Sequence, residues 1–169
     1  MTRNRAIPIL LWTAAVALMA MIFAFSAQPA SESSETSSPF VDAYMRLFHP
    51  EADSLSPDEQ FELREQASFI VRKAAHFSIY TLLGLLLAAA VSAAFPAARA
   101  ATWAGRLWLP FLIGALWAVS DEIHQHFVPG RSCEIRDMSI DSSGVLLGVL
   151  LFTAGVRLAA RLRTGRTPE

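Results

Sequence analysis

Three short segments of the sequence hold most of the ionisable residues that could do chemistry: residues 72–77, 120–131 and 136–144. Their carboxylates offer the oxygen ligands that a hard divalent cation prefers. A histidine joining these acids would favour a softer metal. A divalent cation is therefore one candidate cofactor, with no particular metal indicated. The carboxylates are Asp121, Glu122, Asp137 and Asp141, and the histidines are His76 and His124.

The same segments also carry cations, which suggest a different ligand. Lys73, Arg131 and Arg136 could bind an anionic group such as a lipid phosphate or a carboxylate. A histidine beside a carboxylate could act as a general base. These residue types are compatible with phosphoryl or acyl chemistry on an envelope lipid and with binding alone. They are equally compatible with ion pairs that only hold helices together.

The three segments lie at the ends of long apolar blocks that predict membrane-spanning helices. Hydrophobic residues make up 53% of the 169 residues and charged residues 17%. A helix of about 20 apolar residues crosses a hydrocarbon core of about 30 Å. We therefore predict an all-α integral membrane bundle of four transmembrane helices, in a single domain covering residues 1–169. The expected spans are residues 6–27, 74–95, 107–127 and 139–160.

The starts of the first two spans need separate interpretation. The first apolar block could be a cleavable signal peptide, since Arg3 and Arg5 precede it. Its apolar stretch exceeds the roughly 7–15 residues of a signal-peptide core, which favours a retained helix. Before the second span, Ser56, Pro57 and Glu59 form the pattern of a helix N-cap with a capping box. The second span should therefore continue a polar helix that begins at this cap.

The loop expected between the first two spans is long and polar. Residues 27–39 are rich in Ser, Glu and Pro, which predicts a solvated loop. Phe40, Tyr44, Leu47 and Phe48 then recur at helical spacing. They predict an amphipathic segment of one or two turns at residues 40–48. Such a segment is suited to lie on a membrane surface or to cover the mouth of the bundle.

Basic residues that flank the spans predict the orientation in the membrane. A four-span topology puts three basic segments on one side, and every acid except Glu169 on the other. Both termini are therefore expected in the cytoplasm, in a multi-pass protein of the cell inner membrane. The pair Arg72-Lys73 is an exception, because it lies on the expected outer side. The basic residues on the cytoplasmic side are Arg3, Arg5, Arg99, Arg106, Arg157, Arg161, Arg163 and Arg166.

This topology brings the three ionisable segments together at the outer ends of the second, third and fourth spans. Ionisable groups near a membrane usually face the bundle interior and pair with one another. Small residues spaced four apart on the fourth span let helices pack closely on the same face as its acids. We therefore expect one polar pocket built by three or four helices. The faces hold Lys73, His76 and Tyr80; Asp121, His124 and Gln125; and Asp137, Asp141, Gly144 and Gly148.

These ordered motifs resemble the VanZ-like family over roughly residues 10–155. The motifs are Lys73-Ala74-Ala75-His76-Phe77, Ser120-Asp121-Glu122-Ile123-His124-Gln125, Phe127-Val128-Pro129-Gly130-Arg131, and the run from Asp137 through Asp141 to Gly144. The sequence Phe25-Ser26-Ala27-Gln28-Pro29 is also similar to the family's first-helix ending, whereas residues 30–66 carry no motif of the family. The resemblance implies a small bacterial integral membrane protein. The founding member of that family is associated with resistance to the glycopeptide antibiotic teicoplanin.

Pattern and resemblance together predict a VanZ-like protein of the cell envelope. We expect it to bind or modify a lipid-linked or anionic amphiphilic molecule at the outer leaflet, with teicoplanin susceptibility as a candidate phenotype. Membrane lipids are the expected partners, and the net charge of −1 gives no indication of nucleic-acid binding. A rival interpretation is a structural or assembly protein whose polar cluster only clasps the helices. Transport is not indicated, because the middles of the spans lack ionisable residues.

The resemblance and the helical faces also assign candidate roles to individual residues. Whether the protein is an enzyme stays open at this level. The single cysteine, Cys133, excludes an internal disulfide. The candidate catalytic residues are His76, Asp121, Asp137 and Asp141. The residues expected to contact the ligand are Lys73, Glu122, Gln125 and Arg131.

Overall fold

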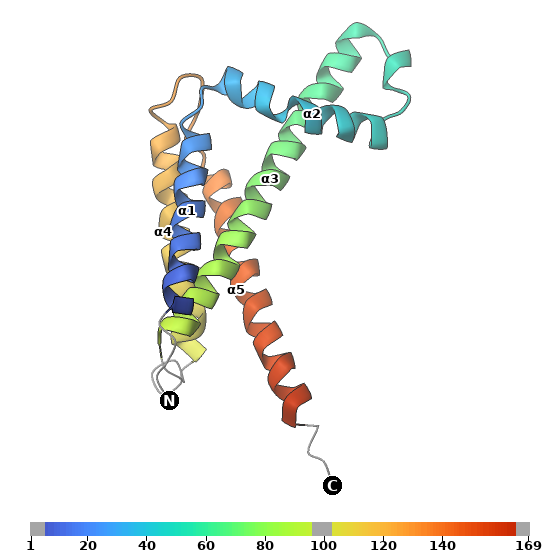
Figure 1. Cartoon of the computed structure of the whole chain (residues 1–169). Coiled ribbons are helices and arrows are strands. Elements are labelled where there is room, and N and C mark those ends of the chain that lie inside the picture. The colour runs from blue at the N-terminus through green and yellow to red at the C-terminus, as the bar shows by residue number, and fades with distance from the viewer. Residues whose placement is uncertain (1–5, 96–102, 165–169) are drawn as a thin grey trace.

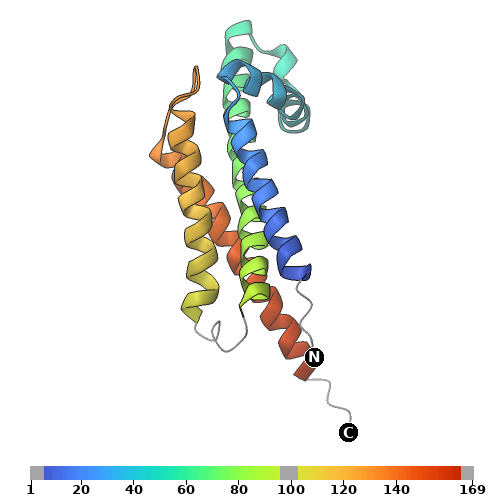
Figure 2. The same cartoon turned by 60° about the vertical axis from the view of Figure 1, so that its left-hand side comes forward.

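The computed structural model describes residues 6–95 and 103–164, which are all-α with no strand among them. Four long helices run roughly along one axis, and a fifth, α2, lies across one end of them (Figures 1 and 2). We call that end the α2 end of the bundle. The long helices are α1 (Ala6–Ser26), α3 (Pro57–Ala94), α4 (Trp103–Gln125) and α5 (Ile135–Thr164), while α2 covers Ala30–Phe48 and a 3₁₀ turn covers Ala52–Ser54.

Three of the described helices are long and apolar enough to cross a membrane: Ala6–Ser26, Pro57–Ala94 and Ile135–Arg163. They correspond to the first, second and fourth predicted spans. Helix α4 covers most of the third predicted span but is not among them. It also ends at Gln125, because residues 126 and 127 form a turn rather than the last helical residues expected there.

Helix α3 is one continuous helix of 38 residues, which confirms the prediction of a polar segment running into the second span. Its start is fixed by the predicted capping box. The Ser56 backbone N–H donates to Glu59 Oε2 at 2.9 Å, and the Glu59 N–H donates to Ser56 Oγ at 3.4 Å. These bonds satisfy donors that a helix N-terminus otherwise leaves free.

The solvated loop predicted at residues 27–39 is wrong, because α2 already begins at Ala30 and runs for 19 residues. Its hydroxyl groups bond within the helix. Ser34 Oγ donates to the Ala30 carbonyl and Thr36 Oγ1 donates to the Glu32 carbonyl, each at 2.9 Å. Such bonds let Ser and Thr sit inside a helix at little cost. The helix also tolerates Pro39, although a proline removes one backbone donor.

The core forms where α1, α3, α4 and α5 meet. Glycines set how closely α3 and α5 approach, as the small-residue stripe predicts. A Cβ on Gly148 would collide with the backbone of Thr81, and a Cβ on Gly144 would crowd the Phe77 carbonyl. Gly84 and Gly114 make room for Val145 in the same way. The buried cluster comprises Ala15, Leu18, Ile22, Tyr80, Leu83, Leu87, Ala88, Ala118, Val145 and Val149.

Candidate functional site

Three polar side chains on α3, about one turn apart, face acids on α4 and α5. Lys73 forms an ion pair with Asp137. His76 Nδ1 lies 3.5 Å from Asp141 Oδ1, and the Tyr80 hydroxyl donates to Asp121 Oδ2 at 3.2 Å. Side chains three or four residues apart share a helix face, so these pairs form a series that runs into the bundle. We call this series the polar ladder.

Asp121 ends the polar ladder and is the most fully hydrogen-bonded of its acids. Its side chain is only 1% exposed. Oδ2 accepts hydrogen bonds from Ser26 Oγ at 2.7 Å, from Tyr80 at 3.2 Å and from Gln125 Nε2 at 3.5 Å. Neutral donors of this kind replace the water that burial removes. Three helices, α1, α3 and α4, are therefore joined at one buried oxygen atom.

Arg131 joins this network indirectly, through two hydrogen bonds. Its Nη1 donates to Gln125 Oε1 at 3.4 Å, and its Nε donates to the Gln28 carbonyl at 3.3 Å. The guanidinium is thereby fixed between the end of α1 and the turn after α4. Burial, followed by the nearby positive charge of Arg72, lowers the pKa of Arg131 from its ordinary value. Two like charges held close together form a favourable place for an anion.

Asp141 is as deeply buried as Asp121 but poorly satisfied. It is 1% exposed, and neither of its oxygens has a hydrogen-bond partner in the described part of the chain. The His76 ring pairs with it, with Nδ1 at 3.5 Å from Asp141 Oδ1. Buried polar atoms are nearly always bonded, if necessary to water. A histidine beside a carboxylate is the arrangement that general bases use, so the geometry of the His76–Asp141 pair is compatible with that role.

Glu122 and Asp137 lie where α5 begins. Glu122 is 1% exposed, and its Oε1 accepts the backbone N–H of Glu134 at 2.8 Å, directly before the first residue of α5. Asp137 lies in the first turn of α5, where a carboxylate interacts favourably with the helix dipole. Arg136 pairs with Glu134 at 2.8 Å, and its Nε also lies 4.0 Å from Asp137 Oδ1. Glu122 thus positions the start of the helix that carries Asp137 and Asp141.

A cavity of about 540 Å³ opens beside the polar ladder, between the end of α1, one face of α2 and the middle of α3. Of the predicted site residues, His76 and Arg131 line it. The other predicted site residues are not part of its lining: Lys73, Asp121, Glu122, Gln125, Asp137 and Asp141. The full lining is Ile22, Phe25, Ser26, Gln28, Ser33, Thr36, Ser37, Phe40, Tyr44, Val71, Arg72, Ala74, Ala75, His76, Ser78, Ile79, Tyr80 and Arg131.

Residues that were not assigned a site role from the sequence also line the cavity. Ser26 and Tyr80 line it and donate to Asp121, and Arg72 adds a second positive charge. Tyr80 shares a helix face with Lys73 and His76, and this spacing places it in the predicted polar pocket, although without a catalytic or ligand-binding role. Ser26 belongs to the motif Phe25-Ser26-Ala27-Gln28-Pro29 at the end of the first predicted span, but its bond to Asp121 forms only because folding brings the end of α1 to α4.

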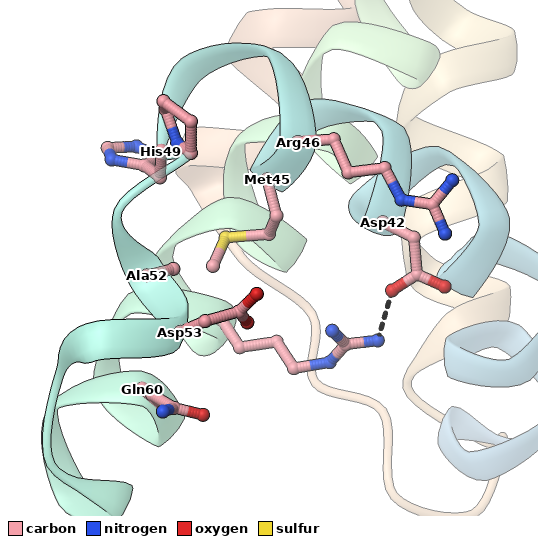
Figure 3. Close-up of a pocket in the computed structure, with 9 residues that line it drawn as sticks. Asp42, Met45, Arg46, His49, Ala52, Asp53 and Gln60 are labelled. Carbon is pink, nitrogen blue, oxygen red and sulfur yellow. Dashed lines mark hydrogen bonds and ion pairs between the residues drawn. The ribbon is translucent and has the colours of Figure 1, made fainter.

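A second pocket, of about 600 Å³, lies where the end of α2 meets the start of α3 (Figure 3). Charged side chains of both signs line it, and Arg64 Nη2 bonds to Asp42 Oδ1 at 2.6 Å. None of the predicted site residues belongs to its lining. Its lining residues are Asp42, Met45, Arg46, His49, Pro50, Ala52, Asp53, Gln60 and Arg64.

The acids do not gather into a metal centre. Across residues 6–95 and 103–164, no group of three or more His, Cys, Asp or Glu side chains is placed to hold a metal ion. Three of the acids are instead spread along the polar ladder, each opposite a different side chain of α3: Asp137, Asp141 and Asp121. The geometry therefore gives no support to the divalent cation considered above.

Long apolar helices joined by a buried polar ladder define a helical membrane protein. A family model described as VanZ/LLP1 matches residues 11–158. The chain therefore belongs to the VanZ/LLP1 family, as the motifs indicate. No curated protein and no solved structure matches the chain.

Proposed function

We propose that this protein binds an anionic amphiphile at the outer leaflet of the bacterial inner membrane. The observation that carries the proposal is the cavity beside the polar ladder. Most of its wall is apolar, and its charged lining residues, Arg72 and Arg131, are cations. An acyl or prenyl chain suits the apolar wall, and a phosphate or carboxylate suits paired arginines. A lipid-linked molecule carries both parts.

The proposal includes α4 as a fourth span. A helix of 23 residues is about 34 Å long at 1.5 Å per residue, enough for a hydrocarbon core of about 30 Å. One side of α4 is a continuous exposed apolar stripe, which suits contact with lipid. The stripe consists of Trp108, Leu109, Leu112, Leu116, Val119 and Ile123.

The proposed orientation places both termini in the cytoplasm. Among the described residues, Arg106 near the start of α4 and Arg157, Arg161 and Arg163 near the end of α5 lie at the opposite end of the bundle from α2 (Figure 1). Basic residues concentrate on the cytoplasmic side of membrane proteins. Arg3, Arg5, Arg99 and Arg166 lie outside the described residues. The α2 end and the polar ladder then face the outer side.

The buried acids fit a positioning role in this proposal. Asp121 holds Ser26 and Tyr80, and through Gln125 it holds Arg131, so one carboxylate fixes three cavity-lining groups. Asp141 similarly orients His76. His76 is then the histidine of the cavity lining that lies next to a bound ligand. Modification of the ligand, as distinct from binding, would act through His76.

The proposal extends to glycopeptide susceptibility through the family resemblance. A protein that binds an envelope lipid at the outer leaflet could change how an antibiotic reaches its target there. We expect expression in a susceptible bacterium to raise the inhibitory concentration of teicoplanin. The Arg72→Gln variant at equal abundance should not raise it.

A second candidate function is favoured by the Lys73–Asp137 ion pair, which links α3 to α5 without touching the cavity. In this view the polar ladder is a clasp that assembles the helices, and the cavity has no ligand. The two candidates differ in what a cavity variant changes. A clasp predicts effects only on stability, whereas a binding site predicts loss of ligand from a stable protein.

Binding of dodecyl phosphate and of uncharged dodecanol to the purified protein in nanodiscs separates these candidates. We expect the phosphate to bind at least tenfold more tightly, and Arg72→Gln to remove most of that preference. Arg72→Gln is the preferred variant, because Arg131 also holds Gln28 and Gln125. Arg46→Gln is the matched control, since it removes the same charge from the second pocket. Equal binding of both probes, or an equal effect of both variants, would refute the proposed site.

A further inference from the structure

The apolar residues of α2 occupy one side of the helix, and its charged residues occupy the other. At 3.6 residues per turn, the apolar side covers about a third of the circumference. Part of that side, from Ser33 to Tyr44, lines the cavity, and Val41 is buried. The same side continues past the cavity with Leu47 and Phe48, which are 73% and 59% exposed. The charged side consists of Glu32, Glu35, Asp42 and Arg46.

The cavity shows which way the apolar side of α2 points. Ile22 and Ile79 also line the cavity, and each lies within an apolar helix, about one turn in from Ser26 and His76 respectively. The cavity therefore lies between α2 and the membrane-spanning part of the bundle. The α2 residues that line it point toward the membrane. Leu47 follows Phe40 by two helical turns on the same side, so it points the same way about 10 Å further along.

The connection to α1 limits how far α2 can be from the membrane surface. Helix α1 ends at Ser26, and α2 begins at Ala30. Four residues reach at most about 14 Å when fully extended. The Ala30 N–H also donates to the Pro129 carbonyl at 3.2 Å, which ties α2 to the turn after α4. Both views show α2 lying across the long helices rather than along them (Figures 1 and 2).

From these observations we infer that α2 lies in the membrane–water interface, with the lipid of the bilayer as the partner of its exposed apolar side. Phe40, Leu47 and Phe48 insert between the lipid chains beside the bundle, and Glu35 and Arg46 face water. An amphipathic helix of this kind gains stability from the apolar area that it buries in lipid. A lipid surface fits better than a soluble partner, because this side faces the bilayer and continues the apolar wall of the cavity. The inference depends on α1 crossing the membrane and not on a ligand in the cavity.

Site-directed spin labelling tests the inference directly. In a Cys133→Ser background, single cysteines replace Leu47, Phe48, Glu35 and Arg46, and each carries a nitroxide in phosphatidylcholine–phosphatidylglycerol nanodiscs. Oxygen concentrates in lipid and a nickel chelate concentrates in water, so the ratio of their collision rates reports depth. A fifth label replaces Leu10, which is 70% exposed on α1, and supplies the lipid reference.

We expect the oxygen-to-nickel ratio at positions 47 and 48 to approach that at position 10, and to exceed the ratio at 35 and 46 at least fivefold. Equal ratios at all four α2 positions would overturn the inference, as would a water-like ratio at position 10. Neither outcome depends on dodecyl phosphate binding, so failure here and failure of the proposed site are distinguishable.

Discussion

Replacing Lys73 by methionine should destabilise the protein much more than the same change in an exposed ion pair. The Lys73 and Asp137 side chains are 23% and 16% exposed, so they are largely shielded from solvent. Removing one partner of a buried ion pair lowers the free energy of unfolding by about 3–5 kcal/mol, whereas an exposed ion pair contributes about 0–1 kcal/mol to it. At this intermediate burial we expect Lys73→Met to lower the free energy of unfolding by about 2 kcal/mol.

A double-mutant cycle separates the pair from other effects of each change. Asp137→Asn should also cost about 2 kcal/mol, partly because Asp137 lies in the first turn of α5 and loses its dipole interaction. The double variant should cost about 1 kcal/mol less than the sum of the single costs, because it leaves no unpaired charge. Arg64 and Asp42 provide a matched control. Their atoms approach to 2.6 Å, but the side chains are 50% and 43% exposed.

Reversible unfolding in mixed detergent micelles, with tryptophan fluorescence as the readout, measures the wild type and the six variants of the two cycles. We expect a coupling free energy of about 1 kcal/mol for Lys73–Asp137 and below about 0.5 kcal/mol for Arg64–Asp42. Additive effects at Lys73 and Asp137 would refute the reasoning that burial makes this pair significant. A larger coupling in the exposed pair would refute it as well.

Three further changes have direct expected outcomes. Gly148→Ala should destabilise the protein by about 1–3 kcal/mol, because the added Cβ meets the α3 backbone. Gly155→Ala is the control and should be neutral, since nothing in the described structure lies within 4 Å of a Cβ at that position. Thermal unfolding of both variants checks this. Tyr80→Phe should cost about 1 kcal/mol by removing one donor to Asp121, and denaturant unfolding measures that loss. Ser56→Ala should increase hydrogen exchange in the first turn of α3 by about fivefold, consistent with a cap worth about 1 kcal/mol, and should leave exchange in the buried half unchanged.

The helices along the bundle axis were predictable because their sequence signals are local. Length, apolar composition and the Ser56 cap locate α1, α3 and α5 without knowledge of their neighbours. Helix α2 was not predictable in this way, because its first half is rich in serine and contains Pro39. Those residues favour loops in isolation. In the folded chain, intrahelical hydroxyl bonds and packing against α3 stabilise the helix instead.

Part of the candidate site was also predictable from the sequence, and part was not. Helical periodicity places Lys73, His76 and Tyr80 on one face, and the structure pairs each of them with an acid on a neighbouring helix. Which residues line the cavity could not be read from the sequence, because the cavity exists only where α2 folds over α1 and α3. Ser26 illustrates the difficulty, since its bond to Asp121 joins residues 95 positions apart.

The most direct test asks whether the α2 end of α3 and the turn between α4 and α5 lie on one side of the membrane. Cys133 is native and exposed in that turn, and Gln66 is exposed on α3 two turns before Lys73. Single-cysteine proteins carrying Cys133, Gln66→Cys or Arg106→Cys are treated with a membrane-impermeant maleimide in intact cells. Cys133 and Gln66→Cys should react from outside, and Arg106→Cys only after lysis. Reaction of Cys133 and Gln66→Cys from opposite sides would contradict the polar ladder itself.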